Sequence, residues 1–335
     1  MSRRIAPGHE AASPGLSDFS DVVLDLYRGA RERPLDQFQD AALEVVKKIV
    51  PFNTAIWGTA SVDATGVDIH TIHLHRTSRD MLDAYEHVKH EDACGAEILR
   101  HGRSTQSYHS RTNWARTECG EFLREFEHEN FIVSGESNRD ASFIHWFSLY
   151  RAKPEQRCQP EENKLVEALR PHLMQALALN RSLHLERTMP ALIGLERGLA
   201  VANVRGMLYL TDPRFDRLMS AEWPGWAGPA LPTGLMTHLL ARHRTFSGRR
   251  LVLRCRVEHG LLFLQARRRR AVDALTAKEL RTARLVADGH THKEIATRLS
   301  LSSATTRSQI QSAYEKLGVH NVAGLIEELK PALWT

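Results

Sequence analysis

The sequence has little of what marks secreted or membrane-bound proteins. No stretch approaches the roughly 20 consecutive apolar residues that a membrane-spanning helix requires, and the N-terminus lacks the apolar run of a signal peptide. The few cysteines are scattered without C-x-x-C spacing, which argues against a disulfide framework or a cysteine zinc site. We therefore expect a cytoplasmic protein without a membrane partner. The cysteines are Cys94, Cys119, Cys158 and Cys255.

Motifs of catalysis are missing as well. The chain contains no G-x-S-x-G, no phosphate-binding glycine loop and no H-E-x-x-H. The nearest approach is Gly135-Glu136-Ser137, which lacks the following glycine that a nucleophile elbow needs. We expect no enzyme, no catalytic residue and no cofactor, which leaves room for a small-molecule effector of unknown identity.

Composition and charge indicate a multidomain globular protein. Hydrophobic residues make up 42% and charged residues 25% of the 335-residue chain, which predicts two or three domains. The net charge of +5 permits nucleic-acid binding without requiring it. Ten arginines and one acid lie between Arg242 and Arg270, and the last four arginines form a run from Arg267. We expect residues 267–274 to be a basic linker that either contacts phosphates or remains solvated.

The first part of the chain predicts a mixed helix and strand domain. Residues 1–15, rich in proline and glycine, are expected to be disordered. Over residues 16–159, helices, a strand pair, helices and a second strand pair follow one another, which predicts an α+β domain with an antiparallel sheet. This arrangement resembles the GAF-like sensor domains. The helices are expected at 16–31, 35–50, 78–90 and 117–128, and the strands at 54–60, 67–75, 131–134 and 142–150.

Two further segments follow before the C-terminal domain. Residues 160–190 predict one long helix with a leucine stripe, which we interpret as a connector between domains; the alternative is a helix packed on its own domain. Residues 191–266 are similar to an abbreviated PAS-like domain of α+β class. Its expected elements are strands at 199–204 and 207–210, a helix capped by Asp212, a helix at 233–243, and strands at 250–257 and 261–266.

Two groups of side chains in the first domain are candidates for ligand binding. His73 and His75 would share one face of a strand, with His70 on the other face. Two imidazoles lack the third protein ligand of a usual zinc site, so we interpret the cluster as chance and expect no metal site. We favour core packing as the explanation of the aromatic candidates, with a ligand pocket as the alternative. The residues that could line a pocket are Trp57, Tyr85, Trp114 and Trp146.

The last sixty residues carry the most specific pattern. Ile295 and Leu299 give a short helix an apolar stripe, and Leu301-Ser302-Ser303 interrupts it, with Ser302 or Ser303 as the N-cap of a second helix. A small, polar front opposite an apolar back is typical of a recognition helix that enters the major groove. The back consists of Ile310, Tyr314 and Leu317, and the front of Ala304, Arg307, Ser308, Gln311 and Glu315.

Over about fifty residues this segment resembles the LuxR-type helix-turn-helix family of bacterial transcription regulators. The matching positions are Leu275 to Glu279, Gly289, Lys293 to Ala296, Leu299, Leu301, Ser302, Thr305 and Tyr314 to Val319. The resemblance implies an all-α, four-helix DNA-binding domain at 275–335, controlled by the preceding sensor domains. It also implies double-stranded DNA as a partner and a homodimer as the binding species.

The exposed face of the two helices supplies the expected DNA contacts. Arg307 and Gln311 are four residues apart and long enough to read bases, whereas Lys293 and Thr305 are expected to touch phosphates. The full set of expected contacts is Lys293, Ser303, Thr305, Arg307, Ser308 and Gln311.

Several positions depart from the family pattern. The family usually has valine at Thr306, histidine at Gln309 and arginine at Val322, and Arg281-Thr282-Ala283 replaces a glutamate and two aliphatics. These departures leave open an alternative function from another class. In that alternative, the chain is a protein-interaction adaptor whose degenerate helix-turn-helix serves for dimerisation or anti-activation.

Overall fold

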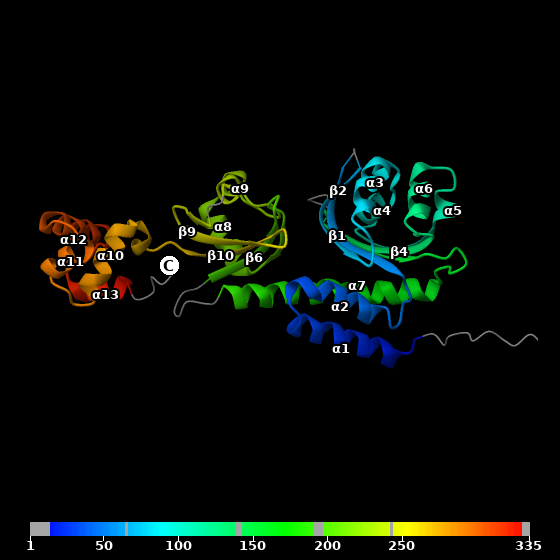
Figure 1. Cartoon of the computed structure of the whole chain (residues 1–335), viewed down its shortest axis with the longest axis horizontal. Coiled ribbons are helices and arrows are strands. Elements are labelled where there is room, and N and C mark those ends of the chain that lie inside the picture. The colour runs from blue at the N-terminus through cyan, green and yellow to red at the C-terminus, as the bar shows by residue number, and fades with distance from the viewer. Residues whose placement is uncertain (1–13, 64–65, 139–142, 190–196, 242–243, 330–335) are drawn as a thin grey trace, which may run out of the picture. The chain divides into compact units, whose positions relative to one another are not determined.

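The computed structural model describes residues 14–63, 66–138, 143–189, 197–241 and 244–329 (Figure 1). The expected disorder of residues 1–15 therefore falls almost wholly outside the described residues. The chain divides into two compact units, Met1–His184 and Leu185–Thr335. Within the described ranges, no helix is both long and apolar enough to cross a membrane.

Unit 1 is built on a five-stranded sheet with the strand order β2-β1-β5-β4-β3. All neighbouring strands are antiparallel, and the pairing of β1 with β5 brings the two hairpins of the domain into one sheet. The predicted α+β class of this domain is thereby confirmed. The strands are β1 Thr54–Asp63, β2 Gly66–His75, β3 Arg103–His109, β4 Asn130–Asn138 and β5 Phe143–Arg151.

Helices cover both faces of this sheet (Figure 1). Because side chains alternate along a strand, Trp57 of β1 packs with α1, α2 and α7, whereas its neighbour Ile56 packs with the helices of the opposite layer. The first layer is α1 Leu16–Glu32, α2 Leu35–Val46 and α7 Pro160–Thr188. The second is α3 Asp80–Val88, η1 Lys89–Glu91, α4 Cys94–His101, α5 Ser110–Asn113 and α6 Glu118–Glu125.

Helix α7 confirms the expected long helix and contains Pro171 within it. Val166, Leu169 and Leu173 are fully buried in the core that α7 shares with α1 and α2. The N-terminal half of α7 therefore packs on its own domain, as the alternative interpretation of this helix requires.

Unit 2 begins with a second five-stranded antiparallel sheet, of order β7-β6-β10-β9-β8. His259 and Gly260 form the two-residue turn of the β9–β10 hairpin, both with positive φ (49° and 73°), as a type I′ turn requires. Asp212 accepts hydrogen bonds from two backbone N–H groups and caps α8, as predicted. The elements are β6 Arg197–Asn203, β7 Leu208–Thr211, α8 Pro213–Glu222, α9 Thr233–Leu240, β8 Thr245–Ser247, β9 Leu251–Glu258 and β10 Leu261–Arg268.

The C-terminal part of unit 2 is all helical, as predicted. Local capping defines the starts of its helices, because Thr276 and Thr291 each form a reciprocal capping box with a glutamate three residues later. Four α-helices follow a short 3-10 helix. They are η3 Ala271–Ala274, α10 Ala277–Ala287, α11 His292–Leu299, α12 Ser303–Leu317 and α13 Val322–Leu329.

Some elements escaped the sequence pattern. Strand β3 lies at the edge of its sheet and reads Arg-Ser-Thr-Gln-Ser-Tyr-His, without the apolar alternation that identifies a half-buried strand. Helix α4 and the three-residue β8 were missed as well. The expected basic linker at 267–274 is also largely folded, because β10 extends through Arg268 and residues 271–274 form η3.

Candidate nucleic-acid interface and sensor cavity

Helices α11 and α12 are joined by a tight turn. Ser300 adopts the left-handed conformation (φ 52°) and ends α11, and Ser302 begins α12 by accepting a hydrogen bond from the backbone N–H of Thr305. Of the two serines that the sequence offered as N-cap, Ser302 is therefore the one used.

The front of α12 is exposed, as predicted. Arg307, Ser308 and Gln311 are solvent-exposed, and Gln311 donates a 2.9 Å hydrogen bond to Glu315 on the same face. Ser303, Thr305 and Lys293 are also exposed, and the Thr305 hydroxyl shares a 2.8 Å hydrogen bond with Ser302 at the N-cap. All six predicted contact residues thus present their side chains to solvent on α11 and α12. DNA contact by these residues stays a prediction.

The back of α12 enters the core of the helical domain. Ile310 and Leu317 are buried beside Ile295 of α11 and Leu325 of α13, and Tyr314 packs against them while half-buried. Ile295, Ile310 and Leu317, which the periodicity identified, all belong to this core, and none of the front residues does.

The departures from the family pattern fit this core. Thr306 is fully buried, and its hydroxyl donates a 3.1 Å hydrogen bond to the Ser302 carbonyl, which satisfies the polar group that a valine would lack. The Thr282 hydroxyl donates a 2.7 Å hydrogen bond to the side-chain carbonyl of Gln309. Two departures are thus partners of each other across α10 and α12, whereas Val322 is exposed at the start of α13.

Glu279 connects the start of α10 to the end of α12. Its carboxylate accepts hydrogen bonds from Lys316, Ser312 and the Thr276 N-cap, at 2.6 to 2.9 Å. These donors, Lys316 foremost, lower the pKa of Glu279 to about 2. The charged carboxylate fixes the helix that faces the back of α12.

The arginine run does not act as one group. Arg267 is 3% exposed and forms a two-point ion pair with Asp273, at 2.5 and 2.6 Å. Arg270 donates to the backbone carbonyl of Glu328 on α13. Arg267 and Arg270 therefore have structural partners, whereas Arg268 is exposed at the end of β10.

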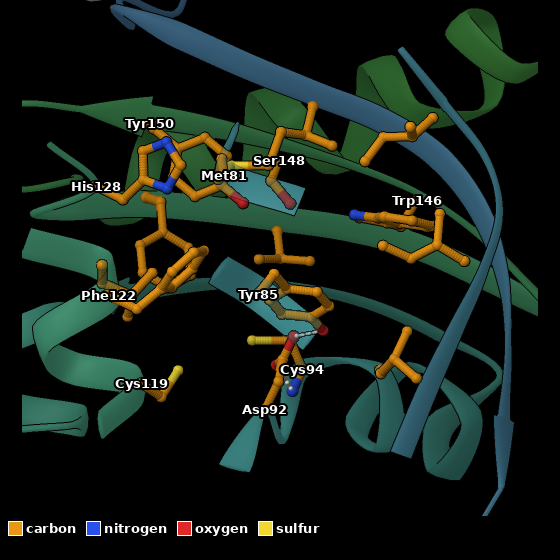
Figure 2. A pocket seen from close by; sticks show the side chains of 18 of the residues that line it. Met81, Tyr85, Asp92, Cys94, Cys119, Phe122, His128, Trp146, Ser148 and Tyr150 are labelled. Carbon is orange, nitrogen blue, oxygen red and sulfur yellow. Dashed lines mark hydrogen bonds between the residues drawn. The ribbon is translucent and has the colours of Figure 1, made fainter. Parts of the chain in front are cut away.

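A cavity of about 80 Å³ lies in unit 1 between the sheet and helices α3 to α6 (Figure 2). A site for one water needs roughly 10–15 Å³ of such volume, so the cavity exceeds that several-fold. Its walls are mainly apolar and include Tyr85, Trp114 and Trp146 of the predicted set. Trp57, the fourth predicted residue, packs on the opposite face of the sheet and does not line the cavity.

The lining of the cavity includes polar groups, among them the pair Tyr85 and Asp92. The Tyr85 hydroxyl donates a 2.8 Å hydrogen bond to Asp92, whose other oxygen accepts one of 2.8 Å from the Cys94 backbone (Figure 2). Burial raises the pKa of Tyr85, with the Asp92 charge adding to the effect. The aromatic candidates therefore lie beside a carboxylate, Asp92, that our set of predicted pocket residues did not include.

The remaining titratable groups of the cavity are kept neutral by burial. The pKa of His128 falls to about 3, and that of Cys119 rises to about 12. The His128 ring stacks on Tyr150 with the centroids 3.7 Å apart. His128 was missed in the sequence because no local pattern shows that a loop histidine will be buried against β5.

The tight turn between α11 and α12 and the exposed face of α12 are the architecture of a helix-turn-helix domain. Residues 273–329 match the family model "Bacterial regulatory proteins, luxR family". This match assigns residues 273–329 to that family and supports a role for the chain in transcription regulation. No curated protein sequence matches the chain significantly.

Three solved structures of bacterial proteins are distantly similar to this chain. An N-acylhomoserine lactone dependent LuxR family transcription factor, CepR2 from Burkholderia cenocepacia, is 13% identical with a TM-score of 0.36, over 48% of this chain and 93% of that one. SdiA from Escherichia coli is 10% identical with a TM-score of 0.35, over 95% and 99%. The VqsR LBD domain from Pseudomonas aeruginosa is 10% identical with a TM-score of 0.36, over 50% and 99%. Such scores support no conclusion about fold or ligand.

Proposed function

We propose that the cavity of unit 1 binds a small effector and thereby controls DNA binding by α12. The observation that carries this proposal is the cavity itself, which combines mainly apolar walls with a half-buried hydrogen-bonded pair, Tyr85 and Asp92. Ligand sites are typically apolar pockets with a few polar groups that orient the ligand.

The polar groups of the cavity limit the chemical class of the effector. His128, Cys119 and Tyr85 are neutral at physiological pH by the pKa shifts above. Asp92 accepts hydrogen bonds, so it pairs with an N–H or O–H donor on the ligand. The proposed effector is a small, mainly apolar molecule that carries such a donor.

On the DNA side, we propose that a homodimer places one α12 from each protomer in successive major grooves. Two half-sites one helical turn apart, about 34–36 Å, would then be read together. The effector would act by favouring the protomer arrangement that meets this spacing.

The test uses the full chain. A thermal-shift screen against small molecules should yield a ligand that raises the unfolding temperature, since binding to the folded state alone stabilises it. Val133→Phe, which puts a larger side chain into the cavity wall, should abolish the shift. Tyr27→Phe, which removes a hydroxyl on α1 outside the cavity, should retain it. A ligand that stabilises Val133→Phe as well as the parent would refute the cavity as its site.

The same preparation separates regulator from adaptor. Selection from random duplex DNA, followed by a salt-dependent mobility-shift assay, should return a sequence-specific site for the regulator. The adaptor alternative predicts that no sequence is enriched and that partner proteins bind the helical domain instead.

A further inference from the structure

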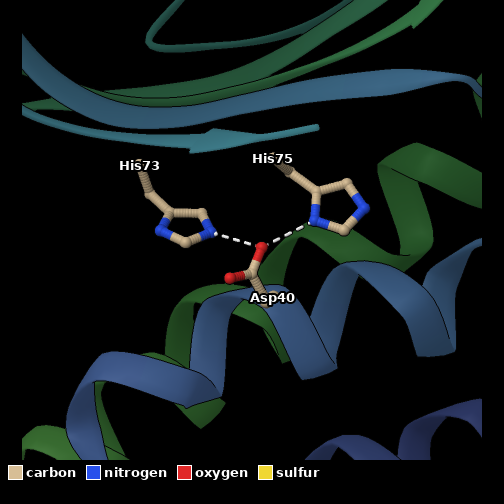
Figure 3. A group of neighbouring side chains, drawn as sticks. All are labelled: Asp40, His73 and His75. Atoms are coloured by element: carbon tan, nitrogen blue, oxygen red, sulfur yellow. Dashed lines mark hydrogen bonds and ion pairs between the residues drawn. The ribbon is translucent and has the colours of Figure 1, made fainter. Parts of the chain in front are cut away.

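We propose that Asp40, His73 and His75 form a binding site for a divalent transition-metal ion of the zinc type in unit 1 (Figure 3). The site lies on the layer of the sheet opposite the effector cavity and is independent of the proposed effector.

The fold brings the three side chains together from two elements. His73 and His75 are two residues apart on β2 and so share one face; they pair across the ladder with Trp57 and Ala55, whose side chains enter the α1–α2–α7 core. The two imidazoles therefore face the helical layer. There α2 presents Asp40, which lies between them (Figure 3).

The donor atoms converge as metal ligands do. One oxygen of Asp40 is 2.7 Å from Nδ1 of His75 and 3.0 Å from Nε2 of His73, and all three atoms lie within 4.8 Å of one another. Ligands at about 2.0–2.1 Å from a tetrahedral zinc ion stand roughly 3.3 Å apart. Binding of the ion therefore requires side-chain rotations that lengthen these two contacts and bring all three donor atoms to that spacing.

A fourth residue is placed to support ligation through Nδ1 of His75. Its other ring nitrogen, Nε2, is buried and lies 3.0 Å from a carboxylate oxygen of Glu44, one turn along α2 from Asp40, although the two atoms are not aligned for a hydrogen bond. A ligating histidine commonly presents its second N–H to a carboxylate, which sets the tautomer and orients the ring. Glu44 is held in place by Arg76 at 2.8 Å.

Ligand type and access select the class of metal. Imidazole and carboxylate together suit zinc, nickel, cobalt and ferrous iron, whereas magnesium and calcium prefer oxygen ligands alone. Strand β2 is at the edge of the sheet, and the Asp40 side chain is 54% exposed, so solvent reaches the site and supplies the remaining ligand. A bound ion would tie α2 to β2, segments some 33 residues apart.

The experiment measures metal binding by the full chain after treatment with a chelator. Calorimetric titration with Zn²⁺ should show that the parent binds one ion more per chain than His73→Gln or Asp40→Asn does. Glu44→Gln should weaken that ion by about 10- to 100-fold, as loss of an outer carboxylate does. Co²⁺ should give the visible absorption of a bound ion in the parent, and excess Mg²⁺ should not displace it.

His70→Gln is the matched control. His70 lies on the same strand, but its ring contacts Ser61 at 2.9 Å on β1 and belongs to no donor cluster with Asp40. This variant should bind the ion as the parent does. Circular dichroism of each metal-free variant checks that it is folded. The proposal is overturned if the parent binds no ion, or if folded His73→Gln and Asp40→Asn variants bind it as the parent does.

Discussion

At the scale of single residues, the helical domain depends on a carboxylate that the helix pattern alone does not reveal as central. Glu279 caps α10 and also accepts hydrogen bonds from Lys316 and Ser312 of α12. Its pKa is lowered to about 2 from an ordinary 4.5, because the folded state supplies donors to the charged form. The charged carboxylate therefore stabilises the fold.

The sign of this shift predicts an acid-side loss of stability. The contribution is complete above pH 4.5, where Glu279 is charged even in the unfolded chain, and it disappears as the pH falls from 4.5 towards 2. Urea unfolding of segment 271–335, which has its own core, should show the parent losing more stability over this range than Glu279→Gln. Equal losses in parent and variant would contradict the assignment, and Lys316→Ala should resemble Glu279→Gln.

The front and back of α12 should respond differently to truncation. Arg307→Ala or Gln311→Ala removes an exposed side chain, so the fold should be unchanged, while operator binding should weaken by about 1–3 kcal/mol and lose preference mainly at one base pair. Ile310→Ala creates a buried cavity and should cost about 2–5 kcal/mol of folding stability. If both front variants bind the operator as the parent does, this face does not read bases directly.

At the scale of elements, β10 and η3 give the arginines of the run Arg267–Arg270 different surroundings. Arg267 is buried and forms an ion pair with Asp273. Its replacement should therefore mainly lower the stability of the segment that joins β10 to η3, rather than the affinity for DNA. Arg268 is exposed, and Arg269 donates to the Gly248 carbonyl from a half-buried position. Within the run, Arg268 is therefore the residue best placed to contribute a phosphate contact.

A pair of variants separates these roles. Arg268→Ala should lower affinity for all DNA sequences alike and flatten the slope of log affinity against log salt by up to ~0.9. Arg267→Ala should lower the unfolding temperature, because it leaves the half-buried Asp273 without its ion-pair partner. An unchanged slope for Arg268→Ala, measured by fluorescence anisotropy over a salt series, would assign that arginine to solvation.

At the scale of the whole molecule, effector and operator should be coupled in both directions. An effector that strengthens operator binding must itself bind the DNA-bound protein more tightly by the same factor, typically about 5- to 150-fold. Effector affinity measured by calorimetry with and without operator should show this factor, and Val133→Phe should abolish it. Effector binding that leaves operator affinity unchanged would show that the cavity does not control DNA binding by the C-terminal domain.

The sequence by itself determined what depends on local chemistry. The N-cap at Ser302 and the apolar spacing of α11 and α12 depend on residues within one or two turns, so they can be predicted from consecutive residues. The same holds for the hairpins of both sheets and for Asp212 at the start of α8. For this reason the C-terminal domain and the α+β class of the others were predictable.

Only the tertiary structure decided which distant groups meet. Trp57 and Tyr85 were both candidates for lining one pocket, yet they pack into different cores of unit 1. The polar edge strand β3 forms because β4 supplies its hydrogen-bond partners, which no local pattern records. Asp40 reaches His73 and His75 only because α2 packs against β2. Such contacts depend on long-range packing, whose free energy exceeds any local propensity.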